Sequence, residues 1–208
     1  MRTIFLTSKI NRTWPKMVPL LSKDLNTKKL LRITTAGKGV EDTAYLPKGK
    51  QTLEVLGYQI VDYDIEGQDE QEIKEKLLGF DVLLMTGGNT FYLLKAIHDS
   101  GFQKAVEEFL DRGGIYVGGS AGAYVCCPTI KMAEWSRPEW NFMNLTELTG
   151  MNLVLFCVKV HVTEELLPFL RGKAKELNYP LRLLTDDQFL MVQGDRVTFY
   201  GQGEELRV

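Results

Sequence analysis

Residues 113–123 read Gly113-Gly114-Ile115-Tyr116-Val117-Gly118-Gly119-Ser120-Ala121-Gly122-Ala123. A short apolar strand runs into a G-x-S-x-G turn, and a helical pattern follows. This order is the context of a nucleophile elbow, in which a strained turn presents a serine hydroxyl above a sheet. Gly118 and Gly122 leave room for the turn, and the N-terminal N–H groups of the helix favour a developing oxyanion. The stretch predicts Ser120 as a nucleophile, with a helix cap or a phosphate-binding turn as the alternative.

Strand-like runs alternate with helical patterns on both sides of this stretch, which predicts an α/β fold. We expect three α/β/α layers around a mostly parallel sheet. Apolar periodicity predicts helices over Glu70–Leu78, Phe91–Ile97, Phe102–Leu110 and Glu164–Leu177. The last two apolar runs, Phe189–Val192 and Val197–Tyr200, predict a hairpin at the sheet edge. The predicted strands of the sheet are Thr3–Leu6, Leu31–Thr35, Gln59–Tyr63, Val82–Thr86, Ile115–Val117 and Leu153–Val160.

Size and composition predict a single domain over residues 1–208, since domains usually run to roughly 100–200 residues. The chain is 44% hydrophobic and 25% charged, which is typical of a globular protein. A net charge of -2 supplies no basic field for phosphate backbones, so nucleic acid is not an expected partner. The N-terminus predicts neither a signal peptide nor a membrane span, and we expect a cytoplasmic monomer or homodimer.

Three cysteines, Cys126, Cys127 and Cys157, form an odd set without C-x-x-C spacing. Such a set argues against both a disulfide framework and a zinc site. We therefore interpret the three as buried thiols.

A second glycine turn, Thr86-Gly87-Gly88-Asn89-Thr90, follows a predicted strand and precedes a predicted helix. It lies at a carboxyl end of the sheet, where open α/β folds place their sites. We expect the N–H groups of Gly88 and Ala121 to form an oxyanion hole, because acyl transfer needs two donors that converge on one oxygen. Asn89 is a candidate substrate-binding residue. The alternative, compatible with the first, is that Asn89 or Thr90 caps the helix.

A serine nucleophile needs a base within hydrogen-bonding reach, and the chain has two histidines. His98 lies near a predicted helix C-terminus, where a cation is favourable, so we interpret it as structural. His161 follows an apolar strand at the edge where Ser120 is expected, and it comes after the serine, as in α/β hydrolases. His161 is therefore the predicted base, with a half-buried strand-end histidine as the alternative.

A carboxylate should hold the imidazole in the required tautomer. Glu134 is the predicted acid, because it lies beyond the predicted elbow helix where the chain can fold back over the site. Glu139 and Glu164 are the competitors, and a surface glutamate is the simpler interpretation. Arg137, beside two tryptophans in Trp135-Ser136-Arg137-Pro138-Glu139-Trp140, is a candidate for binding a substrate carboxylate, unless the loop only packs onto the domain.

The chain resembles the S51 serine peptidases, the family of aspartyl dipeptidase and, more distantly, of cyanophycinase. The resemblance rests on the elbow, the downstream Pro128-Thr129-Ile130, the second glycine turn and His161. It implies a sheet related to class I glutamine amidotransferases. It also implies a peptidase without metal or cofactor that acts on short peptides, with Ser120 as nucleophile, His161 as base, and Gly88 and Ala121 as oxyanion donors.

Two segments depart from the dipeptidase pattern. Where these enzymes usually carry an aspartate after Pro-Thr-Ile, this chain offers Glu134, one position earlier. The Gly-x-Thr-Arg-x-x-Arg segment that grips an aspartyl substrate is replaced by Val162–Pro168, which has no arginine. The sequence therefore predicts a dipeptidase-like serine peptidase without assigning it aspartyl specificity. An esterase or amidase with the same site, and a non-catalytic binding protein on the same fold, are the alternatives.

Overall fold

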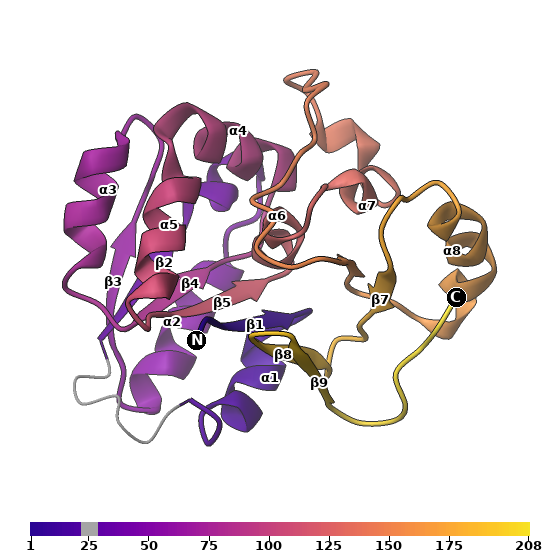
Figure 1. The fold of residues 1–208 in the computed structure, drawn as a ribbon, viewed down its shortest axis with the longest axis horizontal. Helices are drawn as coiled ribbons and strands as arrows, with labels where there is room; N and C mark the ends of the chain where they lie inside the picture. The colour runs from indigo at the N-terminus through magenta and orange to yellow at the C-terminus, as the bar shows by residue number, and fades with distance from the viewer. Residues whose placement is uncertain (22–28) are drawn as a thin grey trace.

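A central sheet divides the molecule into layers in the computed structural model, which describes residues 1–21 and 29–208 (Figure 1). The strand order is β3-β2-β4-β5-β1-β8-β9. The first five strands in this order are parallel, and β8 and β9 form an antiparallel hairpin on the edge of β1. The strands are β1 (Thr3–Thr7), β2 (Lys29–Ile33), β3 (Gln59–Tyr63), β4 (Val82–Met85), β5 (Ile115–Gly119), β8 (Phe189–Gln193) and β9 (Arg196–Tyr200).

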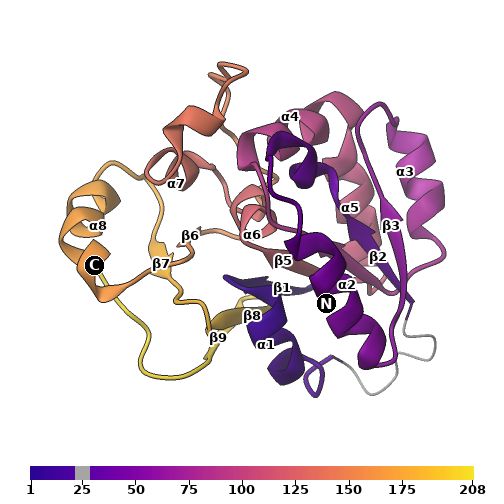
Figure 2. The same ribbon diagram turned by 180° about the vertical axis from the view of Figure 1, so that it is seen from behind.

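Helices cover both faces of this sheet, because its strands are apolar on both sides. Phe5 packs in one core with Trp14, whereas Ile4 and Leu6 point into the other core. Helices from different parts of the chain cover the two faces, as Figures 1 and 2 show from opposite sides. They are α1 (Ile10–Met17) and α2 (Tyr45–Val55) on the first face, and α3 (Glu70–Leu77), α4 (Thr90–Ser100), α5 (Phe102–Asp111) and α6 (Ala121–Cys126) on the second.

A small two-stranded parallel sheet lies beyond the carboxyl end of β5 (Figure 1). Its strands are β6 (Cys157–Lys159) and β7 (Leu181–Leu183). It is accompanied by α7 (Lys131–Glu134), α8 (Leu167–Ala174) and the 3-10 turns η2 (Pro138–Trp140) and η3 (Glu164–Leu166), while η1 (Thr35–Gly39) follows β2. Two sheets therefore meet at the end of β5.

Most of the predicted elements are confirmed, including the mostly parallel sheet, the final hairpin and α3, α4 and α5. The prediction of one long strand over Leu153–Val160 in the central sheet is wrong. Only β6 is a strand, and it belongs to the small sheet, because β8 already occupies the free edge of β1. The preceding segment instead binds the end of α6, where the N–H groups of Met151 and Leu153 donate to the carbonyls of Val125 and Cys126.

The helices differ from prediction in length and number. The predicted helix over Glu164–Leu177 is divided into η3 and the shorter α8, which has Pro168 in its first turn. The sequence analysis did not identify α1 or α2. Both have a proline inside the helix, and such residues conceal a helical pattern.

Candidate active site

Ser120 occupies a strained turn between β5 and α6. Its backbone has φ 52° and ψ -109°, outside the regions that non-glycine residues prefer. Its N–H donates to the carbonyl of Thr7 over 3.0 Å, which fixes the turn to the end of β1. The elbow also needs Gly122, because a Cβ atom there would lie 2.5 Å from the carbonyl oxygen of Met85. These contacts hold the side chain of Ser120 at the carboxyl edge of the sheet.

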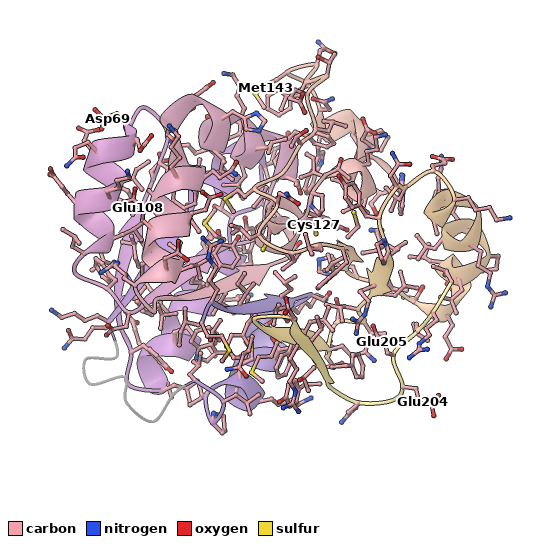
Figure 3. All side chains as sticks on the ribbon, in the orientation of Figure 1. Asp69, Glu108, Cys127, Met143, Glu204 and Glu205 are labelled. Carbon is pink, nitrogen blue, oxygen red and sulfur yellow. The ribbon has the colours of Figure 1, made fainter. Side chains whose placement is uncertain are left out.

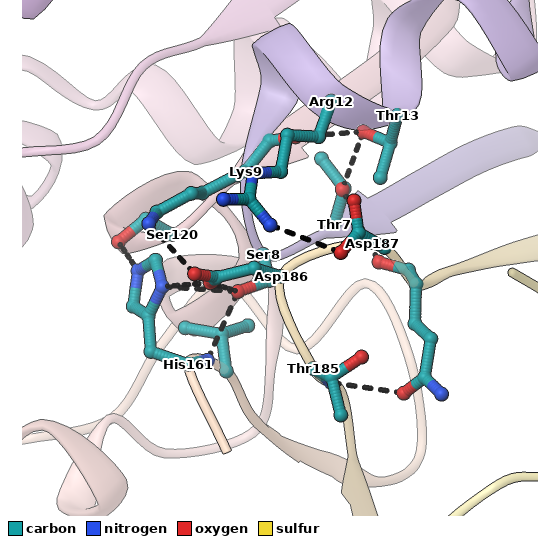
Figure 4. Close-up of polar contacts among 12 residues, drawn as sticks. Thr7, Ser8, Lys9, Arg12, Thr13, Ser120, His161, Thr185, Asp186 and Asp187 are labelled. Atoms are coloured by element: carbon teal, nitrogen blue, oxygen red, sulfur yellow. Dashed lines mark hydrogen bonds and ion pairs between the residues drawn. The ribbon is translucent and has the colours of Figure 1, made fainter. Parts of the chain in front are cut away.

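The structure brings His161 to Ser120. The distance between His161 Nε2 and Ser120 Oγ is 3.0 Å (Figure 4). His161 follows β6, and its φ of 57° puts it in the left-handed region, which is uncommon for a residue with a side chain. Its Nε2 is therefore within reach of the hydroxyl proton of Ser120, as a general base requires.

Asp186, and not Glu134, contacts the ring of His161 in the structure. Asp186 Oδ1 lies 2.7 Å from His161 Nδ1. Glu134 ends the short helix α7 and makes no contact with either ring nitrogen of His161 among the described hydrogen bonds. The reason is topological: β6 and β7 are parallel neighbours, so the residues after their carboxyl ends meet, and Asp186 follows β7.

Among the described contacts, neither competing glutamate is a partner of His161. Glu139 pairs with Arg137 over 3.5 Å, and both side chains are exposed. Glu164 begins the turn η3 and is exposed. Asp186, and not a glutamate, is thus the carboxylate that contacts the ring of His161.

The surroundings of Asp186 keep its carboxylate ionised. Burial raises the pKa of Asp186, but hydrogen bonds from Lys9, His161 and Ser8 outweigh this effect and lower it to about 2. Lys9 Nζ lies 2.7 Å from Oδ2, and Ser8 Oγ lies 2.9 Å from Oδ1. A negative charge therefore faces His161 at neutral pH.

The second glycine turn lies directly against the nucleophile. A Cβ atom on Gly87 would be 3.1 Å from the Cβ of Ser120. Gly88 has a φ of 137° and leaves no room for a side chain, because an added Cβ would lie 2.3 Å from the carbonyl oxygen of Ala36. Ala121 is the first residue of α6, where N–H groups lack partners within the helix. Gly88 and Ala121 therefore lie on elements that flank Ser120.

The contacts of Asn89 are those of a helix cap, which the sequence left open as an alternative. Its side chain is buried and caps α4, with Oδ1 accepting hydrogen bonds from the N–H groups of Phe91 and Tyr92. Its Nδ2 donates to the carbonyls of Gly39 and Trp140. Both ends of the amide are thus engaged within the protein, so the structural alternative holds for Asn89.

A cavity of about 1340 Å³ opens beside Ser120 and His161. Arg137 lines it with an exposed guanidinium that lies over the ring of Trp140 at 5.4 Å. The cavity also exposes the second glycine turn. Arg137 therefore lies on the wall of the same cavity as Ser120.

Lys159 is a cavity residue that the sequence analysis missed. The residue is 3% exposed, and its Nζ bonds the hydroxyl of Tyr124, the hydroxyl of Ser136 and the carbonyl of Val160. All three partners are neutral oxygens. Burial accordingly lowers the pKa of Lys159 to about 8. A single lysine in an apolar strand was the only sequence signal.

The remaining polar candidates lie outside the catalytic contacts. His98 Nε2 is 3.0 Å from the carbonyl oxygen of Thr149, at the end of α4. All three cysteines are free and buried, and Figure 3 shows Cys127 in the interior. Burial raises the pKa of their thiols, which disfavours the reactive thiolate form at all three positions. In the described part of the chain, every helix is too short or too polar to span a bilayer.

Comparisons with known proteins agree on one family. The profile of Peptidase family S51 matches residues 5–200. An uncharacterized peptidase of Listeria monocytogenes serovar 1/2a is 31% identical over 208 residues, which cover 95% of this chain and 97% of that protein. Peptidase E of Salmonella arizonae is 28% identical over 163 residues, or 76% of this chain and 66% of that one. The crystal structure of a candidate peptidase E from L. monocytogenes EGD-e has a TM-score of 0.84 at 29% identity, covering 98% of this chain and 100% of that one.

Proposed function

The chain belongs to peptidase family S51 and is therefore a serine peptidase, and we propose that it hydrolyses short peptides through a triad of Ser120, His161 and Asp186. One observation carries the proposal. Ser120 Oγ, the two ring nitrogens of His161 and the carboxylate of Asp186 form a continuous chain, with contacts of 3.0 and 2.7 Å. This is the arrangement that activates a serine hydroxyl.

The reaction proceeds through an acyl-enzyme. His161 Nε2 takes the hydroxyl proton while Ser120 Oγ attacks the peptide carbonyl, and Asp186 stabilises the imidazolium that forms. The tetrahedral intermediate collapses when the imidazolium gives its proton to the leaving amine. Water, activated by the now neutral His161, then attacks the ester and releases the acid.

The oxyanion is held by the N–H groups of Gly88 and Ala121. Two observations support this assignment. Gly88 and Ala121 lie on two elements that flank Ser120, and the positive end of the α6 dipole points to the same place. Each donor of this kind typically contributes about 3–4 kcal/mol of transition-state stabilisation.

Dipeptidase-like activity is the form of peptidase that we propose. The support is the relationship to proteins named peptidase E, together with positive charges on the cavity wall that attract a peptide carboxylate. Arg137 offers an exposed guanidinium, whereas Lys159 contributes the charge of a buried ammonium whose three N–H groups donate to neutral oxygens of the protein. An esterase or amidase would use the same triad, because the triad determines acyl chemistry and not the leaving group.

Peptide hydrolysis by three forms of the protein tests the proposal. Wild type, Ser120→Ala and His161→Ala are incubated with a dipeptide and tripeptide library read by mass spectrometry, alongside p-nitrophenyl esters and a fluorophosphonate probe. We expect peptide cleavage and labelling by wild type alone. Ester turnover without peptide cleavage would support the esterase, and wild type that neither cleaves nor labels would support a binding protein.

A further inference from the structure

Ser8 contacts both residues that serve the nucleophile. It is the first residue after β1, it is 2% exposed, and its hydroxyl lies at the centre of the contacts drawn in Figure 4. We propose that Ser8 is a positioning residue that fixes the orientation and the tautomer of His161 and holds Asp186 against it. The inference rests on the proposed triad, to which it adds a fourth member.

The hydroxyl of Ser8 makes three contacts at hydrogen-bond distance. It accepts the backbone N–H of His161 over 2.9 Å. It donates to Asp186 Oδ1 over 2.9 Å, and it lies 3.0 Å from His161 Nδ1. One hydroxyl therefore connects the backbone of the base, the ring of the base and the carboxylate that orients the ring.

The position of the hydroxyl proton of Ser8 selects the tautomer of His161. A hydroxyl has one proton and two lone pairs, and ionised Asp186 can only accept. The single proton of Ser8 therefore goes to Asp186, so Ser8 presents only lone pairs to His161. Nδ1 then faces two acceptors and must carry the ring proton, which leaves Nε2 free to accept the proton of Ser120.

The backbone contact supports a conformation that otherwise has little stability. His161 has a φ of 57°, and residues with side chains occupy this region at a cost. The N–H of His161 is directed to Ser8, while the next N–H, of Val162, donates to the carbonyl of Leu184 in the segment after β7. Ser8 thus anchors the turn that aims the imidazole at Ser120.

Lys9 strengthens the same arrangement from the adjacent position. Its Nζ contacts Oδ2 of Asp186, while Ser8 contacts Oδ1, so each carboxylate oxygen has a donor from the start of the segment after β1. Fixing both oxygens limits rotation of the carboxylate. The carboxylate plane is therefore set by residues that directly follow β1 of the central sheet.

The test compares Ser8→Ala with a matched control, Thr13→Val. Thr13 is a buried hydroxyl a few residues along the chain that bonds Thr7 and the carbonyl of Lys9 without touching the triad. We expect Ser8→Ala to lose about tenfold to a hundredfold in kcat/KM, mostly in kcat, as for one lost hydrogen bond to a charged group. Thr13→Val should keep wild-type kcat. Melting temperatures show whether both variants remain folded.

Two further variants and one spectroscopic signal separate positioning from a general loss of structure. Ser8→Thr retains the hydroxyl and should recover most of the activity, whereas Ser8→Cys, a weaker donor of nearly the same shape, should not. The downfield proton resonance of His161 Nδ1–H, identified by its absence in His161→Ala, should shift in Ser8→Ala and stay unchanged in Thr13→Val. This signal does not require turnover, so it tests Ser8 even if the wild type cleaves no peptide, which would refute the proposed function separately. A folded Ser8→Ala with wild-type kcat or an unchanged resonance would overturn the inference.

Discussion

Replacing Asp186 with asparagine should remove most of the catalytic activity while leaving the fold intact. The carboxylate of Asp186 and the ring of His161 are in contact over 2.7 Å. Each charge is spread over its group, so we take about 4 Å as the separation of the two charges. At an effective dielectric constant of about 20, their attraction is about 4 kcal/mol, which corresponds to roughly a thousandfold in rate. The amide can also donate to Nδ1, which favours the unproductive tautomer. We therefore expect kcat/KM of Asp186→Asn to fall by about a thousandfold or more.

The assay measures kcat/KM on the peptide that the wild type cleaves best, together with the rate of fluorophosphonate labelling. Asp187→Asn is the matched control, since the same change one residue later removes only a contact with Arg12. Glu134→Gln tests the acid that the sequence analysis selected, and its activity should stay within about twofold of wild type. Near wild-type activity in Asp186→Asn, or a large loss in Glu134→Gln, would refute the assignment of Asp186.

Three further predictions concern charge and packing. The carboxylate of Asp186, with a pKa lowered from 3.8 to about 2, stabilises the fold fully above pH 3.8 and loses this contribution as the pH falls toward 2. In urea unfolding, the free energy of unfolding of wild type should therefore exceed that of Asp186→Asn above pH 3.8, and this excess should shrink as the pH falls toward 2. Because burial lowers the pKa of Lys159 to about 8, its positive charge is lost as the pH rises through that value. Cleavage of peptides with an additional carboxylate should then decline relative to neutral peptides, and identical pH profiles for both would contradict a role of Lys159 in binding. Trp14→Ala, at a fully buried position, should lower the free energy of unfolding by about 3–5 kcal/mol, whereas Leu78→Ala, at a 69% exposed position, should cost little in the same denaturation experiment.

The elbow and the base could be predicted because local rules govern them. A buried strand followed by G-x-S-x-G has few conformations available, and parallel strands deliver the residues after them to one edge of a sheet. The same rule predicted that His161 lies at that edge. In the structure, however, the strand before His161 belongs to the small sheet and not to the central sheet. The conclusion for Ser120 and His161 therefore did not depend on the exact assignment of the strand before His161.

The orienting acid could not be predicted with the same rules, because its position depends on how the chain returns to the site. Glu134 was the predicted acid because the chain can fold back over the site there, and the competitors Glu139 and Glu164 lie on either side of His161 in the sequence. In this chain Asp186 comes after His161, at the end of the short strand β7. The apolar run before Asp186 was a usable signal of the same kind that identified His161, but its pairing with β6 cannot be read from either segment alone.

The geometry of the site depends on how the small sheet packs against the central sheet. Ser8 and Ser120 leave neighbouring strands of the central sheet, in which Thr7 pairs with Gly119. His161 and Asp186 follow neighbouring strands of the small sheet. The contact between Ser120 and His161 consequently depends on how the small sheet docks, and Ser8 and Lys9 make polar contacts across that junction. This arrangement explains why the pattern of each segment identified candidate residues, whereas the partner of His161 and the role of Ser8 emerged only when the two sheets were placed together.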